Sequence, residues 1–371
     1  MIHRVEEDTK PVVAILTMHD SERQFRGNRQ NFHEIIKTGK DKGYLVYVVT
    51  VRDLKLKADT IRGFISNGDP HTWEQRMFPL PQVIYNRIPY REDEIKPRVR
   101  RKIKQCILHP HIEIYNPFFF NKRKLITWLC KSQLTRKWAP ITKKLKGLPS
   151  LYDMIRRCSY LYLKPEEGKA GQGIMRLKYQ KSKPMPYRLQ IQNNKNSITY
   201  KSASLERVWG RICKETKGAP YIIQQGIELT AVHGRAFDLR LLVQKSDLGV
   251  WGVTGIGARM AGTRSITTHV PRGGTIEDPE KLLPSLFGSE ETEVILNKVR
   301  NAAVHIAKQI EWGCRYKLGE MSMDLGLDTS GGLWFFEANS RPMKFDEPSI
   351  RKRSLERIFD YCDYLIEKQV N

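Results

Sequence analysis

The stretch Leu318–Pro342 reads LGEMSMDLGLDTSGGLWFFEANSRP. Two apolar segments in it flank the turn Asp328–Gly332, and this arrangement predicts a β-hairpin. Asp324 lies at the end of the first segment, and Glu337 and Asn339 lie at the end of the second. Because hairpin strands lie side by side, the oxygen atoms of these three side chains can converge. Oxygen ligands without nearby His or Cys suit Mg²⁺, so we predict that this hairpin holds the magnesium of a bound nucleotide.

The composition sets the outer limits of the interpretation. A chain of 371 residues favours two domains, or one domain with lobes. Its 64 Lys and Arg against 40 Asp and Glu give a net charge of +24, which predicts attraction to polyanions. Nucleic acid, anionic polymers, membranes and nucleotide phosphates all fit that charge, and so does a merely solvated basic surface. No zinc-finger spacing or aromatic RNP-type segment occurs, so nucleic acid is not an expected partner.

The cysteines and the N-terminus indicate a cytoplasmic site of synthesis. Six cysteines are far apart and form no C-x-x-C pair, which predicts reduced, mostly buried thiols and neither disulfides nor a zinc site. The start MIHRVEEDTK has no apolar region, and no run of 18 apolar residues follows it. We therefore expect neither a signal peptide nor a membrane span.

The first 116 residues alternate in the way that is typical of a parallel sheet. Residues 12–18 and 44–50 are apolar and β-rich, and together with the intervening helical pattern they predict a βαβ unit. Residues 82–86 and 112–115 add further strands, so we predict a Rossmann-like domain. The turn MHDSERQFRGN lacks G-x-G-x-x-G, and no NAD site is predicted there. The helical pattern consists of Phe25, Phe32, Ile35 and Ile36.

The segment Arg87–Arg91 follows the end of a predicted strand, where α/β sheets bind ligands. Its arginines are candidates for contacting an anionic substrate. The alternative interpretation, which we favour, is that they are charges facing solvent.

A glycine-rich turn follows the predicted strand at residues 159–164. In the turn PEEGKAGQGI, the glycines at 168, 171 and 173 permit positive φ and close approach of the backbone, so N–H groups can face phosphate oxygens. Lys164, at the end of the strand, can neutralise a phosphate. The order G-x-x-x-x-G-K-[ST] is absent, so the turn is not a P-loop, and glycine-rich hairpins also occur without ligands.

Three further strands carry polar residues near their ends. Residues 221–229 (YIIQQGIEL) could present backbone groups to an adenine edge and a carboxylate to ribose. Residues 237–243 place Asp238 and Arg240 on one face, a spacing usual for a structural ion pair. Residues 251–259 end in Arg259.

Three helices are predicted in the second part of the chain. One spans roughly 125–134, with Lys122 just before it, and one spans 289–313 ahead of the hairpin. His305 in the second helix is interpreted as a surface or packing residue. A C-terminal helix at about 348–369 presents one apolar face, which we expect to pack on the second domain. That face consists of Leu355, Ile358, Phe359, Cys362, Leu365 and Ile366.

Taken in order, Lys122, LYLKPEEGKAGQGI, YIIQQGIEL, DLR, and D-x12-E-x-N followed by SRP resemble the ATP-grasp superfamily. More narrowly, the chain resembles the YheC/YheD family of spore-coat-associated ATP-grasp proteins, to which YNRIPYRE, NPFFFNK and FDLRLLVQKSDLGVWGVTGIGAR are also similar. The resemblance extends from the first strand to about residue 346. It implies a Rossmann-like domain over 1–116 and a two-lobed ATP-grasp domain over 117–371, with a lid lobe at about 140–225 and a metal-binding lobe at about 226–346.

The resemblance also implies roles for single residues. The α- and β-phosphates of ATP would contact Lys122 and Lys164, under a flexible lid that runs from Gly168 through Gly171 to Gly173. The adenine would meet a hinge formed by Gln225, Gly226 and Ile227, with Glu228 as a ribose contact. Magnesium would be held by Asp324, Glu337 and Asn339. The γ-phosphate or a charged intermediate would face Arg240 and Arg259.

Two functions follow from the resemblance. The first is an ADP-forming ligase that activates a carboxylate as an acylphosphate for attack by an amine or thiol. The second is a non-catalytic spore-coat component that keeps the fold and docks on acidic coat proteins or polymers. Superfamily ligases often continue the E-x-N motif with Pro-Gly, whereas Arg341 and Pro342 follow Ser340 here. No acceptor pocket is evident in the sequence.

Overall fold

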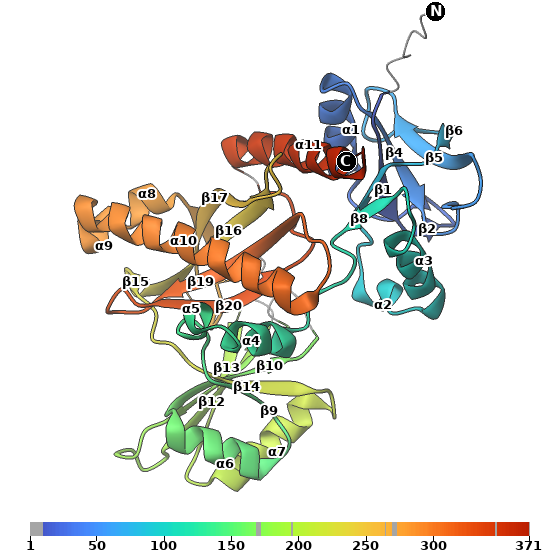
Figure 1. Ribbon diagram of the computed structural model, residues 1–371. Helices are drawn as coiled ribbons and strands as arrows, with labels where there is room; N and C mark the ends of the chain where they lie inside the picture. The colour runs from blue at the N-terminus through green and yellow to red at the C-terminus, as the bar shows by residue number, and fades with distance from the viewer. Residues whose placement is uncertain are drawn as a thin grey trace, which may run out of the picture.

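The described residues form three six-stranded β-sheets, each with its own helices, and one two-stranded sheet (Figure 1). The computed structural model describes residues 10–167, 172–193, 196–263, 265–268, 273–345 and 347–370. The chain passes through the sheets in order, and its last helix then returns to the first sheet (Figure 1).

The first sheet has the strand order β6-β5-β4-β1-β7-β8, in which β4, β1, β7 and β8 run parallel. These four strands coincide with the four predicted ones, whereas antiparallel β5 and β6 were not predicted. The strands are β1 (Val12–Thr17), β4 (Leu45–Thr50), β5 (Thr60–Ser66), β6 (Trp73–Pro79), β7 (Val83–Asn86) and β8 (Glu113–Tyr115), with the small hairpin β2 (His19–Asp20) and β3 (Gln24–Phe25) beside them. The helices are α1 (Arg29–Asp41), α2 (Arg91–Glu94) and α3 (Pro97–Ile107).

The first helix begins later than predicted. Phe25 belongs to strand β3, and α1 starts at Arg29 because the Asn28 side chain accepts a hydrogen bond from the Asn31 N–H at 3.0 Å. Such a side-chain cap satisfies one of the N–H groups that a helix start leaves without a partner.

The second sheet has the order β13-β12-β11-β10-β14-β9, and its described pairings are antiparallel. Leucines of β10 and β11 pack against α6 and α7 on one face. The predicted strand over 221–229 ends earlier, at Gln225. The elements are β9 (Thr142–Lys144), α6 (Leu148–Arg157), β10 (Tyr160–Pro165), β11 (Met175–Tyr179), β12 (Tyr187–Asn193), β13 (Asn196–Ser202), α7 (Leu205–Thr216) and β14 (Tyr221–Gln225).

The third sheet has the order β18-β17-β16-β19-β20, and β15 pairs with β16. Its back packs on α10 and α4 in the largest apolar cluster of the described residues. The strands are β15 (Ala231–Val232), β16 (Arg235–Lys245), β17 (Trp251–Met260), β18 (Thr275–Glu277), β19 (Glu320–Leu327) and β20 (Leu333–Asn339). The helices are α4 (Lys122–Cys130), α5 (Gln133–Arg136), α8 (Pro279–Leu282), α9 (Pro284–Phe287), α10 (Ser289–Cys314) and α11 (Pro348–Val370).

Two predicted features of the second part differ in the structure. The helix predicted over 125–134 is divided into α4 and α5, because Ser132 caps a new helix by accepting from the Leu134 N–H at 3.2 Å. The cysteines are all free, but only three of the six are buried, so the expectation of mostly buried thiols was wrong. No helix within the described ranges carries an apolar stretch that is long enough to cross a membrane.

The C-terminal helix α11 joins the first and third sheets. Its apolar face lies in the same cluster as α1 and β4 of the first sheet, so it does not pack on the second part alone. Phe359 is fully buried there, and its ring lies 4.9 Å from that of Tyr44. On its other side, Ile350 contacts β17 at Gly255, where a Cβ atom would come within 2.5 Å of it.

We predict that Phe359→Ala lowers the free energy of unfolding by about 3–5 kcal/mol, because it removes a fully buried aromatic ring and leaves a cavity. The measurement is urea unfolding followed by tryptophan fluorescence. Lys352→Ala, at an exposed position of the same helix, is the control and should change the free energy by less than about 0.5 kcal/mol. Equal effects of the two substitutions would contradict the packing of α11 described above.

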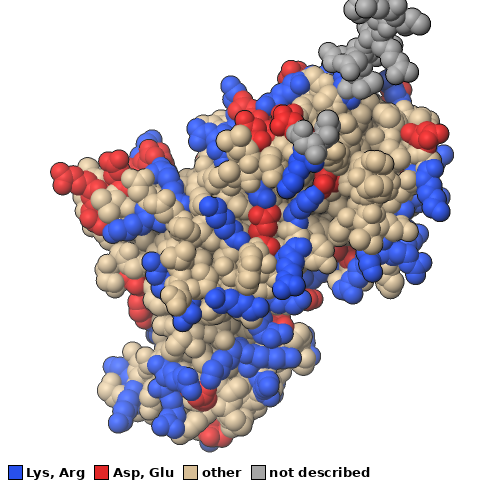
Figure 2. Space-filling view, viewed as in Figure 1, with Lys and Arg blue, Asp and Glu red and all other residues tan. Residues whose placement is uncertain are grey.

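The basic residues are unevenly distributed over this fold. Lys and Arg side chains gather on the lower lobe, which contains β9–β14, α6 and α7 (Figures 1 and 2).

Candidate functional site

A pocket of about 350 Å³ lies between the second and third sheets. This volume is within the range that binds small molecules. From the second sheet it is lined by Tyr160, Tyr162, Lys164, Arg176 and Gln224. From the third sheet it is lined by Asp238, Arg259, Asp324, Phe336 and Glu337.

The predicted hairpin places its acidic residues in this pocket. Asp324 on β19 is the direct cross-strand partner of Glu337 on β20, so the two carboxylates lie on the same face. Asn339 is two residues beyond Glu337 and shares that face. The turn is held by Asp328, whose Oδ1 accepts from the Ser330 N–H at 3.0 Å and the Gly332 N–H at 2.7 Å.

Basic side chains from other elements surround the two carboxylates. The Arg259 Nη2 atom of β17 lies 2.7 Å from Asp324 Oδ2. The Lys122 Nζ atom at the start of α4 lies 3.1 Å from Glu337 Oε2. Arg240 Nη1 lies 3.6 Å from Asp324 Oδ1, which is too long for a hydrogen bond.

Arg259 holds a second carboxylate as well. Its guanidinium donates to both oxygens of Asp238, at 2.9 and 3.0 Å, and Asp238 also accepts from the Thr268 hydroxyl. Burial alone would lower the pKa of Arg259, but Asp324 and Asp238 together outweigh it and raise that pKa. Asp238 therefore pairs with Arg259, which faces it on β17, and not with Arg240 as its spacing suggested.

The ligand set fits a magnesium ion. Asp324 Oδ1 is buried and, within the described residues, has no hydrogen-bond partner, so it is suited to bind a cation. The Asn339 amide donates to Glu337 Oε1 at 3.2 Å, which leaves its oxygen as the possible ligand. No group of three His, Cys, Asp or Glu side chains that could hold a metal occurs in the described ranges. Two carboxylates and one amide remain sufficient for Mg²⁺, which takes its other ligands from water and phosphates.

Lys164 reaches into the pocket from the end of β10. Its Nζ donates to Gln224 Oε1 at 2.6 Å and lies 5.6 Å from the centres of the Tyr162 and Phe336 rings. Burial lowers the pKa of Lys164 to about 8, although the Glu337 carboxylate opposes that effect. The group is therefore a cation at neutral pH that loses its charge in mildly alkaline solution.

The predicted glycine-rich lid is described in part. Gly168 and Gly171 lie outside the described residues. Gly173 has φ +69°, and a Cβ atom there would lie 2.6 Å from the Tyr221 hydroxyl, so only glycine fits without strain. Its carbonyl accepts from that hydroxyl at 3.0 Å, which ties the end of the loop to β14.

The predicted adenine hinge follows β14. The Gln225 and Gly226 N–H groups already donate to the carbonyls of Ile141 and Tyr160, each at 2.8 Å. Ile227 is buried and lines the pocket. Glu228 lies 2.7 Å from Lys178 and is mostly exposed.

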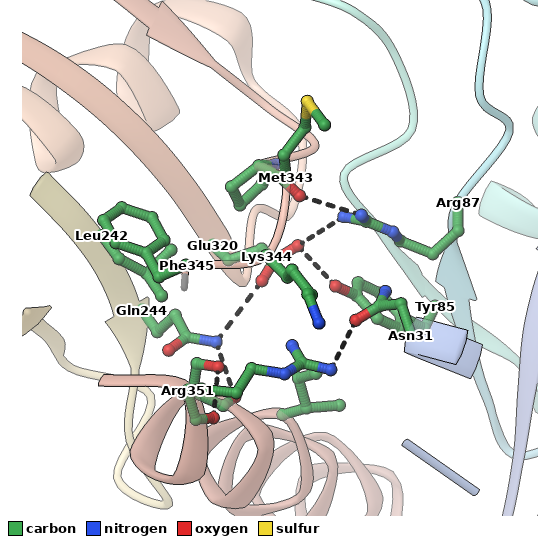
Figure 3. Close-up of a pocket in the computed structure, with 13 residues that line it drawn as sticks. Asn31, Tyr85, Arg87, Leu242, Gln244, Glu320, Met343, Lys344, Phe345 and Arg351 are labelled. Atoms are coloured by element: carbon green, nitrogen blue, oxygen red, sulfur yellow. Dashed lines mark hydrogen bonds and ion pairs between the residues drawn. The ribbon is translucent and has the colours of Figure 1, made fainter. Parts of the chain in front are cut away.

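The arginines of the segment Arg87–Arg91 do not face solvent as expected. Arg87 is 12% exposed and contacts Glu320 at 3.1 Å and the Pro342 carbonyl at 2.8 Å (Figure 3). The Tyr85 hydroxyl donates to the same Glu320 carboxylate at 2.6 Å (Figure 3). These contacts fasten the first sheet to β19, the strand that carries Asp324.

Sequence reasoning missed several pocket residues. Asp238 was interpreted as a partner of Arg240, and Tyr160, Tyr162 and Arg176 were not singled out. The alternation of Tyr160, Tyr162 and Lys164 with buried leucines on β10 was the available signal, since alternate residues of a strand share a face.

Comparisons with known proteins agree with this architecture. A family model described as YheC/D like ATP-grasp matches residues 111–365. The chain is 28% identical, over 382 residues, to the endospore coat-associated protein YheD of Bacillus subtilis (strain 168), a match that covers 100% of this chain and 82% of YheD.

Solved structures of ligases share the fold at low sequence identity. D-alanyl-alanine synthetase A from Vibrio cholerae O1 biovar eltor str. N16961 has a TM-score of 0.51 and 11% identity, covering 98% of each chain. ATP-grasp ligase PsnB, complexed with minimal precursor, Mg and ADP, has a TM-score of 0.50 and 14% identity, covering 97% of this chain and 98% of that one. The predicted fold class, a Rossmann-like domain followed by a two-lobed ATP-grasp domain, is confirmed. Because the family model matches more than half of its residues, the chain belongs to the YheC/D-like ATP-grasp family.

Proposed function

We propose that this protein is a Mg-ATP-dependent, ADP-forming ligase that activates a carboxylate for attack by an amine or thiol. The observation that carries the proposal is that Asp324 and Glu337 lie opposite each other in a pocket that also contains Lys164, with the Asn339 amide hydrogen-bonded to Glu337. Oxygen ligands beside a partly buried cation are what a magnesium-bound polyphosphate requires.

The proposal assigns residues to the phosphates, the adenine and the ribose of ATP. Lys122 and Lys164 bind the α- and β-phosphates, and the loop that ends at Gly173 covers the triphosphate. The adenine lies at the hinge, with the Ile227 backbone facing its edge. Buried Ile174 and Ile227 line the pocket, as does Glu228, which is the proposed ribose contact.

Asp324, Glu337 and Asn339 would hold the magnesium ion, which neutralises phosphate charge when bound. Arg240 and Arg259 are proposed to face the γ-phosphate or a charged intermediate. Their side chains are 23% and 5% exposed, so Arg240 is the more accessible of the two. Arg259, held between Asp238 and Asp324, mainly fixes the position of Asp324.

The reaction proceeds in two displacements. A carboxylate oxygen of the substrate attacks the γ-phosphorus, the bond from that phosphorus to the β–γ bridging oxygen breaks, and ADP leaves. An amine or thiol then attacks the acyl carbon, the bond to the phosphate oxygen breaks, and inorganic phosphate and a proton are released. Cationic side chains and backbone amides supply most of the catalysis, because phosphoryl transfer needs positioning and charge stabilisation.

The second candidate is an assembly role in the spore coat without turnover. It is favoured by the name of the relative YheD, an endospore coat-associated protein. In this role the fold and nucleotide binding are kept, and acidic coat proteins or polymers are the partners of the basic surface.

The pKa of Lys164 gives a prediction for nucleotide binding. Since this pKa is lowered to about 8, the lysine is charged at pH 7 and largely neutral at pH 9. We expect the affinity of wild type for Mg-ATP to fall about tenfold from pH 7 to pH 9, measured by calorimetry. The affinity of the Lys164→Arg variant for Mg-ATP should fall less than twofold over the same range, because arginine stays charged.

Lys164→Met separates a lost charge from a misfolded pocket. This variant should bind Mg-ATP weakly at both pH values, and its affinity should not change between pH 7 and pH 9. An affinity of wild type that is flat from pH 7 to pH 9, or an equal fall in Lys164→Arg, would contradict the role given to Lys164.

Turnover distinguishes the ligase from the assembly role. We expect ADP release to rise at least tenfold when pools of carboxylate compounds and amines are added together with Mg-ATP. Asp324→Asn, which removes one charge of the metal site, is the control and should abolish the rise. A flat response of wild type across broad pools, with Mg-ATP binding intact, would support the assembly role.

A further inference from the structure

More than half of the net charge lies in the lid lobe. Residues 140–225 contain 18 Lys and Arg against 5 Asp and Glu, a net charge of +13 out of +24. Figure 2 shows these basic side chains spread over the lower lobe. A diffuse positive charge attracts any polyanion, so a specific site has to be found in the arrangement of particular residues.

Three of the cations form a row across neighbouring strands. Lys178 on β11 is the cross-strand partner of Arg188 on β12, and Arg188 is the partner of Lys201 on β13. Cross-strand partners share a face, and adjacent strands are about 4.8 Å apart. We call these three residues the cation row. The row starts at β13, the edge strand of the sheet, and continues through Lys178 to its partner Tyr160 in the nucleotide pocket.

The cation row lies on the open face of the sheet. Its neighbours in sequence, Leu177 and Leu189, point the other way and are buried against α6 and α7. Arg188 and Lys201 are exposed, and Lys178 is 31% exposed.

Like charges directly opposite each other destabilise a sheet. Within the described residues, Glu228 contacts Lys178 at 2.7 Å, whereas no carboxylate forms an ion pair with Arg188 or Lys201. Some other cations of the lobe are compensated, as where Lys143 lies 2.5 Å from Asp153. The cation row is thus an arrangement that folding alone does not favour, and an anionic ligand would relieve its repulsion.

We propose that the cation row binds an extended acidic polypeptide, which is part of the substrate or carries it. The pair next to Arg188 and Lys201, Gln190 and Thr199, is polar, so these two exposed cations have no aromatic cross-strand neighbour on which bases could stack. The aromatic ring at the other end of the row, Tyr160, is already occupied by Lys178, whose Nζ lies 4.3 Å from the ring centre. An extended chain places every second carboxylate on one side, about 6.6 Å apart. The backbones of the row are about 4.8 Å apart, and the long Lys and Arg side chains can spread to reach carboxylates at the wider spacing. The choice of carboxylates over phosphates rests on the proposed ligase function, whose substrate presents a carboxylate.

The test is fluorescence anisotropy of a labelled (Glu)12 peptide, without nucleotide. We expect wild type to bind the peptide and to lose affinity as salt is raised. Arg188→Glu with Lys201→Glu should weaken binding at least tenfold. The matched control is Arg207→Glu with Lys214→Glu, which makes the same charge change at exposed positions of α7 and should weaken binding less than twofold.

A second pair of substitutions separates binding from folding. Arg188→Thr with Lys201→Thr removes the repulsion and should leave the melting temperature equal or higher, while it weakens peptide binding about tenfold. Both changes leave Lys178 and the pocket intact, so the affinity for Mg-ATP should be unchanged.

Three results would overturn the proposal: equal losses in the row variant and the α7 variant, no binding of (Glu)12, or tighter binding of labelled (dT)12 than of (Glu)12. The last would indicate nucleic acid. Because the peptide is measured without ATP, a failure here leaves substrate-stimulated ADP release untouched. Conversely, if the peptide binds but substrates do not stimulate ADP release, the proposed ligase function is contradicted, whereas the proposal that the cation row binds an acidic polypeptide stands.

Discussion

The pairing of Asp324 with Glu337 across β19 and β20 is the constraint on which the rest of the site depends. Two carboxylates placed opposite each other repel, and the arrangement persists only where cations lie close to both. The fold brings those cations from separate elements, Arg259 from β17 and Lys122 from α4. The carboxylates of the hairpin therefore require cationic side chains at the positions of β17 and α4 that face them.

The same constraint explains the buried charge cluster behind the hairpin. Arg259 is shared by Asp324 and Asp238, and removing one partner of such a buried cluster would leave an uncompensated charge, at a cost of about 3–5 kcal/mol. On the same strand as Asp324, Glu320 is held by Arg87 and Tyr85 of the first sheet (Figure 3). The strand that carries the proposed magnesium ligand is thus held by ion pairs at its first residue, Glu320, and at Asp324 itself.

Local patterns in the sequence were enough to predict part of this structure. The hairpin, α10 and the four parallel strands coincide with their predictions, because alternation, helical spacing and turn residues are encoded within short segments. The strands β12 and β13 were missed, since their open face is polar and β13 is an edge strand with exposed residues.

Contacts between distant segments could not be predicted in this way. The partner of Asp238 depends on the register of β16 against β17, which places Arg259 opposite it. Arg87 was expected in solvent because its partner Glu320 lies 233 residues further along the chain. Lys122 had no distinctive local signal in so basic a chain. Its place beside Glu337 comes from the packing of α4 on β20.

The central claim is that Asp324, Glu337 and Asn339 bind the magnesium of a nucleotide. Calorimetric titration of wild type and of Glu337→Ala with Asn339→Ala, with ATP in the presence and absence of Mg²⁺, tests it most directly. The account predicts that Mg²⁺ strengthens binding to wild type at least tenfold, about 1.4 kcal/mol, and does not strengthen binding to the double variant. Absence of binding to wild type, or the same response to Mg²⁺ in both proteins, would contradict it.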